Sequence, residues 1–308
     1  MSFERDASPL RQQLSARAEQ LRKEYLRRGF SRDDYQRLVD RAEAVVRTAA
    51  GLKIDDADLQ PIRDCRSVLV SVVKLLTDPK SETIPPTNDE VYAAALTIAR
   101  LGRLFEQFDS APPAWKNQLA LLVRALGSTE TDAGRLLVML EFAGLCRSVG
   151  ISIRPAPEAR AELELEEWQL AASSAVAESR GALSKAAQQA CAGLVAMKRP
   201  GLIVLDAGSA MPDAPSLRRV GNDQTAALEM QRHVDQFIID QHETLVEAVD
   251  TQYAFAAVVG AVLHTVNVST GLVNFAACYR TVNLCELDDP RAPRLRRLMD
   301  RLSAFAMT

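Results

Sequence analysis

The sequence predicts an α/β protein of the α+β type, in which a helical N-terminal region precedes a domain with a mixed central sheet. Residues 1–128 show the apolar spacing of helices and no alternating strand pattern. Residues 129–206 follow the order helix, strand, strand, strand, helix, strand. Two further β-rich runs between Tyr253 and Val282 are expected to extend the sheet. We therefore expect two domains, residues 1–128 and residues 129–308.

Five helices are expected in the first region, because helix start and stop signals recur along it. The expected helices start at Ser8-Pro9, at Ser31, near Leu59, at the Thr87–Glu90 capping box and at Pro112-Pro113. Glycines at Gly29 and Gly127 close the first and the last of them.

In the second region, segments with the apolar spacing of helices alternate with segments that have the two-residue period of strands. Its expected elements are a helix from Thr129 to Gly150, strands at Ile151–Ile153, Glu162–Leu165 and Trp168–Ala172, a helix at Ala182–Lys198, a strand at Leu202–Leu205, a helix at Thr225–Ala248, strands at Ala254–Val266 and Gly271–Val282, and a basic helix at Pro293–Ala304. The last two strands are expected to bury Phe255, Val258, Val262, Leu272 and Phe275 in one core.

Composition narrows the class of protein. The apolar fraction of 47% and the charged fraction of 25% are typical of a globular protein, and the formal net charge of −3 gives no global case for binding nucleic acid. No run approaches the roughly 20 apolar residues of a membrane span. The five cysteines lack a CxxC pair, which favours reduced thiols and a cytoplasmic location.

The element order between Thr129 and Asp206 resembles that of the PD-(D/E)XK nuclease-like superfamily. In that superfamily a glutamate of the first helix, an aspartate of the second strand and an acid-x-lysine of the third strand bind Mg²⁺. The metal activates water and stabilises charge on the phosphate. The resemblance therefore implies Mg²⁺ as the cofactor of an active member and no cofactor for a degenerate one.

Two acids of this chain match the pattern. Glu141 matches the helical acid, and Glu162 lies where the family places its strand aspartate, so the resemblance implies that these two would be the metal ligands. If Trp168–Ser173 is the third strand, Leu170 and Ala172 replace the acid and the lysine. This register, which we favour, predicts a site that has lost its metal.

A second register keeps more of the chemistry. It places Glu167 and Gln169 on the third strand as an acid-x-glutamine variant, and the catalytic set would then be Glu141, Glu162, Glu167 and Gln169. The strand pair between the motifs would be very short, which disfavours this register.

Two further segments, Ser184–Gln189 and Pro200–Asp206, resemble those of uncharacterised bacterial proteins with this fold. The resemblance implies that Gln188 or its neighbour points into the former site, and the alternative is a surface position. Asp206 ends a buried strand, where it either marks a ligand site or begins an ordinary turn.

These acidic residues can also have purely structural roles. Glu164 and Glu166 fit the solvated side of an antiparallel pair, and Glu141 fits a salt-bridged helical acid.

Three functions follow from these alternatives. The first is a degenerate nuclease-like protein that binds nucleic acid or a protein partner, in a setting of bacterial defence that the resemblance alone implies. The others are an active Mg²⁺-dependent nuclease with a migrated site, and a helical interaction or immunity-type protein. Self-association is compatible with all three.

Overall fold

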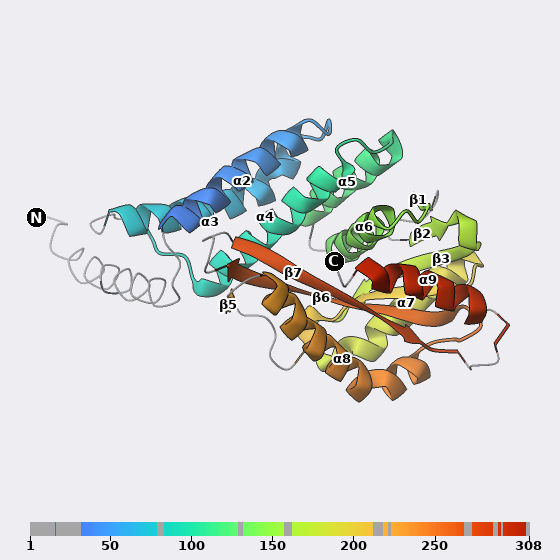
Figure 1. Ribbon diagram of the computed structural model, residues 1–308. Coiled ribbons are helices and arrows are strands. Elements are labelled where there is room, and N and C mark those ends of the chain that lie inside the picture. Colours follow the sequence, from blue (N-terminus) through green and yellow to red (C-terminus); the bar gives the residue numbers. More distant parts are fainter. Residues whose placement is uncertain are drawn as a thin grey trace, which may run out of the picture.

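The computed structural model describes residue 16 and residues 32–78, 83–128, 132–156, 162–211, 218–220, 223–267, 273–285, 289–290 and 292–305. The helix expected from Ser8 to Gly29 lies outside these residues, apart from residue 16. The described N-terminal helices are α2 (Arg32–Ala50), α3 (Gln60–Thr77), α4 (Asn88–Phe108) and α5 (Pro113–Leu126). Figure 1 shows them stacked above the long strands, with helix α8 (Asp223–Ala248) below.

The second region is a mixed sheet interleaved with helices, so the predicted fold class is confirmed. Its strands are β1 (Arg154–Pro155), β2 (Glu162–Leu165), β3 (Leu170–Val176), β4 (Gly201–Asp206), β5 (Arg218–Val220), β6 (Ala254–Asn267) and β7 (Val273–Asn283). The strands β1, β2 and β3 form an antiparallel meander, and β3, β4 and β6 run parallel. Strand β7 pairs antiparallel with β6, and β5 pairs with the far end of β6.

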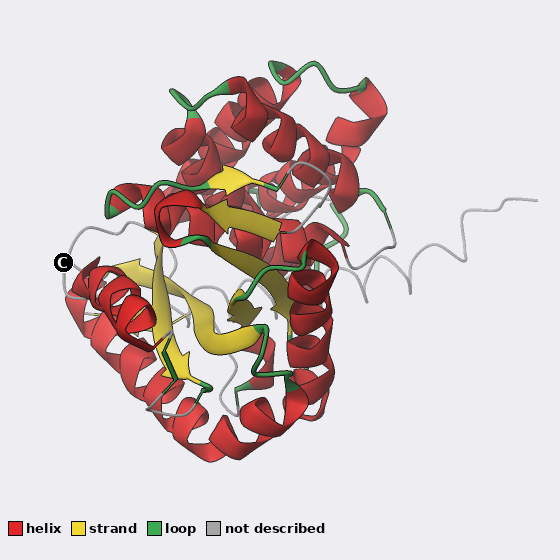
Figure 2. Cartoon of the chain, turned by 90° about the vertical axis from the view of Figure 1, so that its right-hand side faces the viewer, coloured by secondary structure: helices red, strands yellow, loops and turns green. Residues whose placement is uncertain are grey.

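Helices cover both faces of this sheet (Figure 2). On β3 and β4, Ala172 and Leu202 belong to one buried cluster with α6 (Asp132–Ser148) and α9 (Ala292–Phe305). Their chain neighbours Ala171 and Ile203 point the other way, into a second cluster with α7 (Leu183–Met197) and α8. Because consecutive strand residues face opposite sides, the apolar run in β4 serves both cores.

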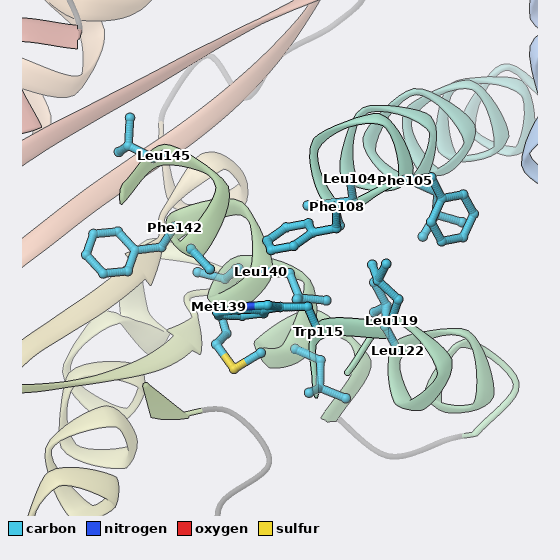
Figure 3. Packing of buried hydrophobic residues seen from close by; sticks show 14 of the residues in the cluster. Leu104, Phe105, Phe108, Trp115, Leu119, Leu122, Met139, Leu140, Phe142 and Leu145 are labelled. Atoms are coloured by element: carbon cyan, nitrogen blue, oxygen red, sulfur yellow. The ribbon is translucent and has the colours of Figure 1, made fainter. Parts of the chain in front are cut away.

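Helix α6 joins the N-terminal helices to the sheet. The first cluster runs without a break from Tyr35 in α2 through α6 to Phe255 in β6. Figure 3 shows Phe108 and Trp115 packed beside Met139 and Leu140 of α6, with the two aromatic rings 5.0 Å apart between centroids. Burying side chains of this size stabilises by roughly 1.5–3 kcal/mol each. The two predicted domains thus share this first core.

The order of elements expected between residues 129 and 206 is confirmed, with shifts at two strands. The first strand was expected at Ile151, but this residue closes α6: its N–H donates to the Cys146 carbonyl at 2.8 Å, after Gly150 at φ 72°. This is the helix-ending geometry that glycine favours. The strand therefore begins later, at Arg154.

Other sequence signals behave as expected. Thr87 and Glu90 form the capping box of α4, in which the Thr87 N–H donates to Glu90 Oε2 at 2.6 Å and the Glu90 N–H donates to Thr87 Oγ1 at 3.2 Å. Phe255 and Val258 are buried in the core. Leu272, and the side chains of Val262 and Phe275, lie outside the described part. In that part, no helix has the length and hydropathy to cross a membrane.

Candidate functional site

Three charged side chains from separate elements meet at the end of β4. Asp206 is the last residue of β4, Glu141 lies in the middle of α6, and Arg100 comes from α4 of the helical region. Ligands of open α/β sheets bind at the carboxyl ends of the parallel strands, which makes this junction the candidate site. We call these residues, together with Tyr279 of β7, the Arg100 cluster.

The Arg100 guanidinium bridges both carboxylates. Its Nε donates to Glu141 Oε1 at 2.7 Å, and its Nη2 donates to Glu141 Oε2 at 2.5 Å and to Asp206 Oδ2 at 3.1 Å. The remaining oxygen, Asp206 Oδ1, accepts the Gly208 N–H at 3.0 Å. The three side chains are only 10%, 9% and 15% exposed for Arg100, Glu141 and Asp206. Each carboxylate oxygen therefore already has a donor inside the protein.

Tyr279 of β7 is the fourth member of the cluster. Its hydroxyl donates to Glu141 Oε2 at 3.4 Å. Tyr279 pairs across the strands with Gly260 of β6, and a Cβ at Gly260 would lie 2.6 Å from the tyrosine ring. The glycine thus leaves room for the ring to lie flat over the sheet and extend its hydroxyl toward α6.

The charges of the cluster stabilise one another. Burial alone would lower the pKa of the Arg100 guanidinium, but the Glu141 and Asp206 carboxylates outweigh burial and raise that pKa above its ordinary value. Burial, reinforced by the Glu141 carboxylate, raises the pKa of Tyr279 well above its ordinary value. The Tyr279 hydroxyl consequently stays protonated at neutral pH and acts as a donor.

The second predicted metal ligand, Glu162, belongs to a different group of residues. Arg135 Nη2 donates to Glu162 Oε1 at 2.9 Å, and Ser173 Oγ donates to the same oxygen at 3.2 Å. Arg135 Nε also donates to the Ser174 carbonyl at 2.9 Å. The described part of β2 begins at Glu162, which pairs with Ser173 of β3. Arg135 thus supplies a hydrogen-bond donor to the carbonyl of the next β3 residue, Ser174.

Helix α7 approaches Glu162 closely through a glycine. A Cβ on Gly193 would overlap Ser173 Oγ and lie 2.7 Å from Glu162 Oε1. We predict that Gly193→Ala lowers the free energy of unfolding by about 1–2 kcal/mol. The overlap with two side chains costs about 2–3 kcal/mol, in the upper part of the range for overpacking, and the better helix propensity of alanine returns about 1 kcal/mol. Urea unfolding followed by circular dichroism measures the difference.

Adding Ser173→Ala to that variant provides the control, because it removes the nearest overlapping atom. The double variant is expected to be more stable than Gly193→Ala alone. A single variant as stable as the parent would show that α7 can move away from the sheet without loss.

Glu164 is buried, so its solvated interpretation is wrong. Glu166 is solvated, but it lies in the 3₁₀ turn that follows β2 and not on an antiparallel strand. Glu164 is 9% exposed and accepts from Arg154 Nε at 2.8 Å, with Arg199 Nη1 at 3.3 Å. These arginines, from β1 and from the segment that follows α7, lie over the carboxylate. Glu166 is 47% exposed and lies 3.0 Å from Arg154 Nε.

The remaining predicted residues do not join Glu141. Glu167 lies in the 3₁₀ turn Glu166–Trp168, and Gln169 ends that turn in the left-handed conformation at φ 54°. The second register required a strand there, but β3 begins only at Leu170. Gln188 is exposed on α7, so its surface interpretation is correct.

The residues at this site do not fit Mg²⁺. Magnesium needs carboxylate and water oxygens in a nearly octahedral arrangement. The carboxylates of Glu141 and Asp206 instead accept from the buried Arg100, and that of Glu162 accepts from the partly buried Arg135. In the described part of the chain, no three His, Cys, Asp or Glu side chains gather closely enough to hold a metal ion.

Arg100 and Arg135 were not singled out from the sequence. A signal for Arg100 was available, because it interrupts the apolar run of α4 between Ala99 and Leu101, just as Glu141 interrupts that of α6. A lone charge in a buried helical run needs a partner of opposite sign. An ion pair between Arg100 and Glu141 could therefore have been predicted from the sequence.

No protein-family model, curated protein or solved structure matches the chain. The resemblance to the nuclease-like superfamily accordingly stays a prediction. The proposed function is based on the hydrogen bonds of Arg100 and Arg135 to the nearby carboxylates.

Proposed function

We propose that this chain is a degenerate nuclease-like protein that acts by binding nucleic acid or a protein partner and cuts neither DNA nor RNA. The observation that carries the proposal is the position of Arg100, whose Nη2 donates to both Glu141 and Asp206. A fixed guanidinium there supplies the positive charge that a metal ion would bring. Unlike a bound metal ion, a guanidinium does not lower the pKa of a water molecule, so it cannot generate the nucleophile of a metal-dependent hydrolysis.

The third strand supports the same proposal. Leu170 and Ala172 of β3 are buried and apolar where the superfamily would carry an acid and a lysine. The migrated-site alternative would need Glu167 and Gln169, which lie in the turn before β3, where Glu167 lies 3.9 Å from Arg301. Neither set of residues assembles the electrophilic and basic groups of a nuclease.

A cleavage assay tests the proposal. We expect the protein to leave linear DNA, plasmid DNA and RNA intact in the presence of Mg²⁺ or Mn²⁺, and the metals to leave its melting temperature unchanged. The matched variant is Glu141→Gln, which keeps the size of the side chain and removes its charge. Metal-dependent cutting by the parent that disappears in Glu141→Gln would overturn the proposal.

A further inference from the structure

Helix α9 presents an arginine-rich face to solvent. Leu298 and Leu302 on its inner side are buried in the core shared with α6 and the sheet. Its outer side carries four exposed arginines, Arg294, Arg296, Arg297 and Arg301, and one exposed acid, Asp300. Residue spacing places Arg294, Arg297 and Arg301 in one stripe along the helix. We call these three residues the α9 stripe.

The charge of the α9 stripe is only weakly compensated. Arg297 Nε donates to the Pro293 carbonyl at 3.4 Å, and Arg301 lies 3.9 Å from Glu167 and over the Trp168 ring. Arg294 has no ion pair with any acid in the described part of the chain. Helix α2 differs, since Arg41 is paired with Glu106, a residue of α4, and Glu43 with Arg66, a residue of α3.

We propose that the α9 stripe binds the phosphate backbone of nucleic acid. This inference rests on the proposed function, because it names the partner and the surface of a protein that binds without cutting. Guanidinium groups bind phosphate oxygens through paired hydrogen bonds. Seven residues of helix rise about 10.5 Å, and one DNA strand carries a phosphate per about 3.4 Å of axis. The stripe is therefore long enough for three successive phosphates.

Other partners fit α9 less well. A basic amphipathic helix binds a membrane by inserting its apolar side, but Leu298 and Leu302 of α9 are already buried within the protein. An acidic protein surface could also meet arginines. The regular spacing favours a polyanion with evenly repeated charges, and the acidic protein becomes an outcome of the test.

Salt-dependent binding provides that test. Fluorescence anisotropy with a labelled 20-base-pair duplex would be measured over a range of KCl concentrations. Each phosphate contact contributes about 0.9 to the slope of log K against log salt. We expect Arg294→Gln/Arg297→Gln/Arg301→Gln to reduce that slope by about 2.7 and to weaken binding at low salt.

The control removes the same charge elsewhere. Arg37, Arg47 and Arg124 are exposed on α2 and α5, and their triple replacement by Gln is expected to leave the slope nearly unchanged. Equal weakening in both triple variants would show that net charge alone governs binding, and would overturn the inference.

Two further outcomes would also overturn it. The first is a parent protein that does not bind the duplex, and the second is one that binds a poly-glutamate peptide as tightly as the duplex. Neither bears on cleavage, so the proposed function would stand with a protein as the partner. Metal-dependent cleavage together with stripe-dependent binding would instead overturn the proposed function and leave the α9 surface in place.

Discussion

Replacing Arg100 with methionine is expected to lower the free energy of unfolding by about 3–5 kcal/mol. Methionine keeps part of the buried stem but removes the cation, so Glu141 and Asp206 would lie buried without their shared donor. A buried charge that loses its partner retains its desolvation penalty. Urea unfolding, followed both by circular dichroism and by tryptophan fluorescence, gives the difference and tests whether the transition is two-state.

Two controls identify the cause. Arg124→Met removes an arginine that is 50% exposed and lies 3.5 Å from Asp58, and it should change stability by less than about 0.5 kcal/mol. Adding Glu141→Gln and Asp206→Asn to Arg100→Met removes the uncompensated charges and should recover part of the loss. If Arg100→Met unfolds at the same urea concentration as the parent, the Arg100 cluster does not stabilise the fold.

Gly201→Ala is expected to destabilise by about 3 kcal/mol or more, at the upper end of the range for overpacking. Gly201 begins β4, and a Cβ there would overlap the Ala171 carbonyl oxygen and lie 2.6 Å from its carbon. The clash involves backbone atoms, so no side-chain rotation relieves it. Gly201 is also held by its N–H, which donates to the Tyr253 carbonyl at 2.7 Å. The β3–β4 pair would have to separate locally.

Gly181→Ala is the matched control for Gly201→Ala. A Cβ at Gly181 would meet no atom within 4 Å. Stability is expected to stay within about 0.5 kcal/mol of the parent, as for surface substitutions in general. Equal losses in the two variants would show that the clash with the Ala171 backbone is not the cause, because the lower flexibility of alanine in the unfolded chain by itself favours folding. Thermal and urea unfolding of both variants distinguish these cases.

Local patterns made the element order predictable. The Thr87–Glu90 capping box, the apolar run Leu202–Leu205 and the alternation in Glu162–Leu165 each depend on residues a few positions apart. The structure places a helix start, a buried strand and an edge-side strand at these positions. The turn Glu166–Trp168 was missed because three residues and a left-handed Gln169 carry no distinctive periodicity.

The site was less predictable because its partners are distant in sequence. Glu141 and Asp206 could be named as candidates, but their common partner Arg100 lies 41 and 106 positions away. The burial of Glu164 likewise depends on Arg199, which reaches it only after α7 has crossed the sheet. Such pairings follow from tertiary packing, which a single sequence does not specify.

The sequence separation within the Arg100 cluster also affects how the chain matures on the ribosome. Arg100 is synthesised roughly 180 residues before Tyr279, an interval of roughly 10–40 s at typical elongation rates. During this time the α4 helix can leave the exit tunnel, while Asp206 is added only after 106 further residues and Tyr279 only at the end of the interval. The helices made first therefore cannot complete their packing until nearly the whole chain has been translated. Nascent chains that stall before β7 should be sensitive to proteases, and they should bind chaperones that recognise exposed apolar helices.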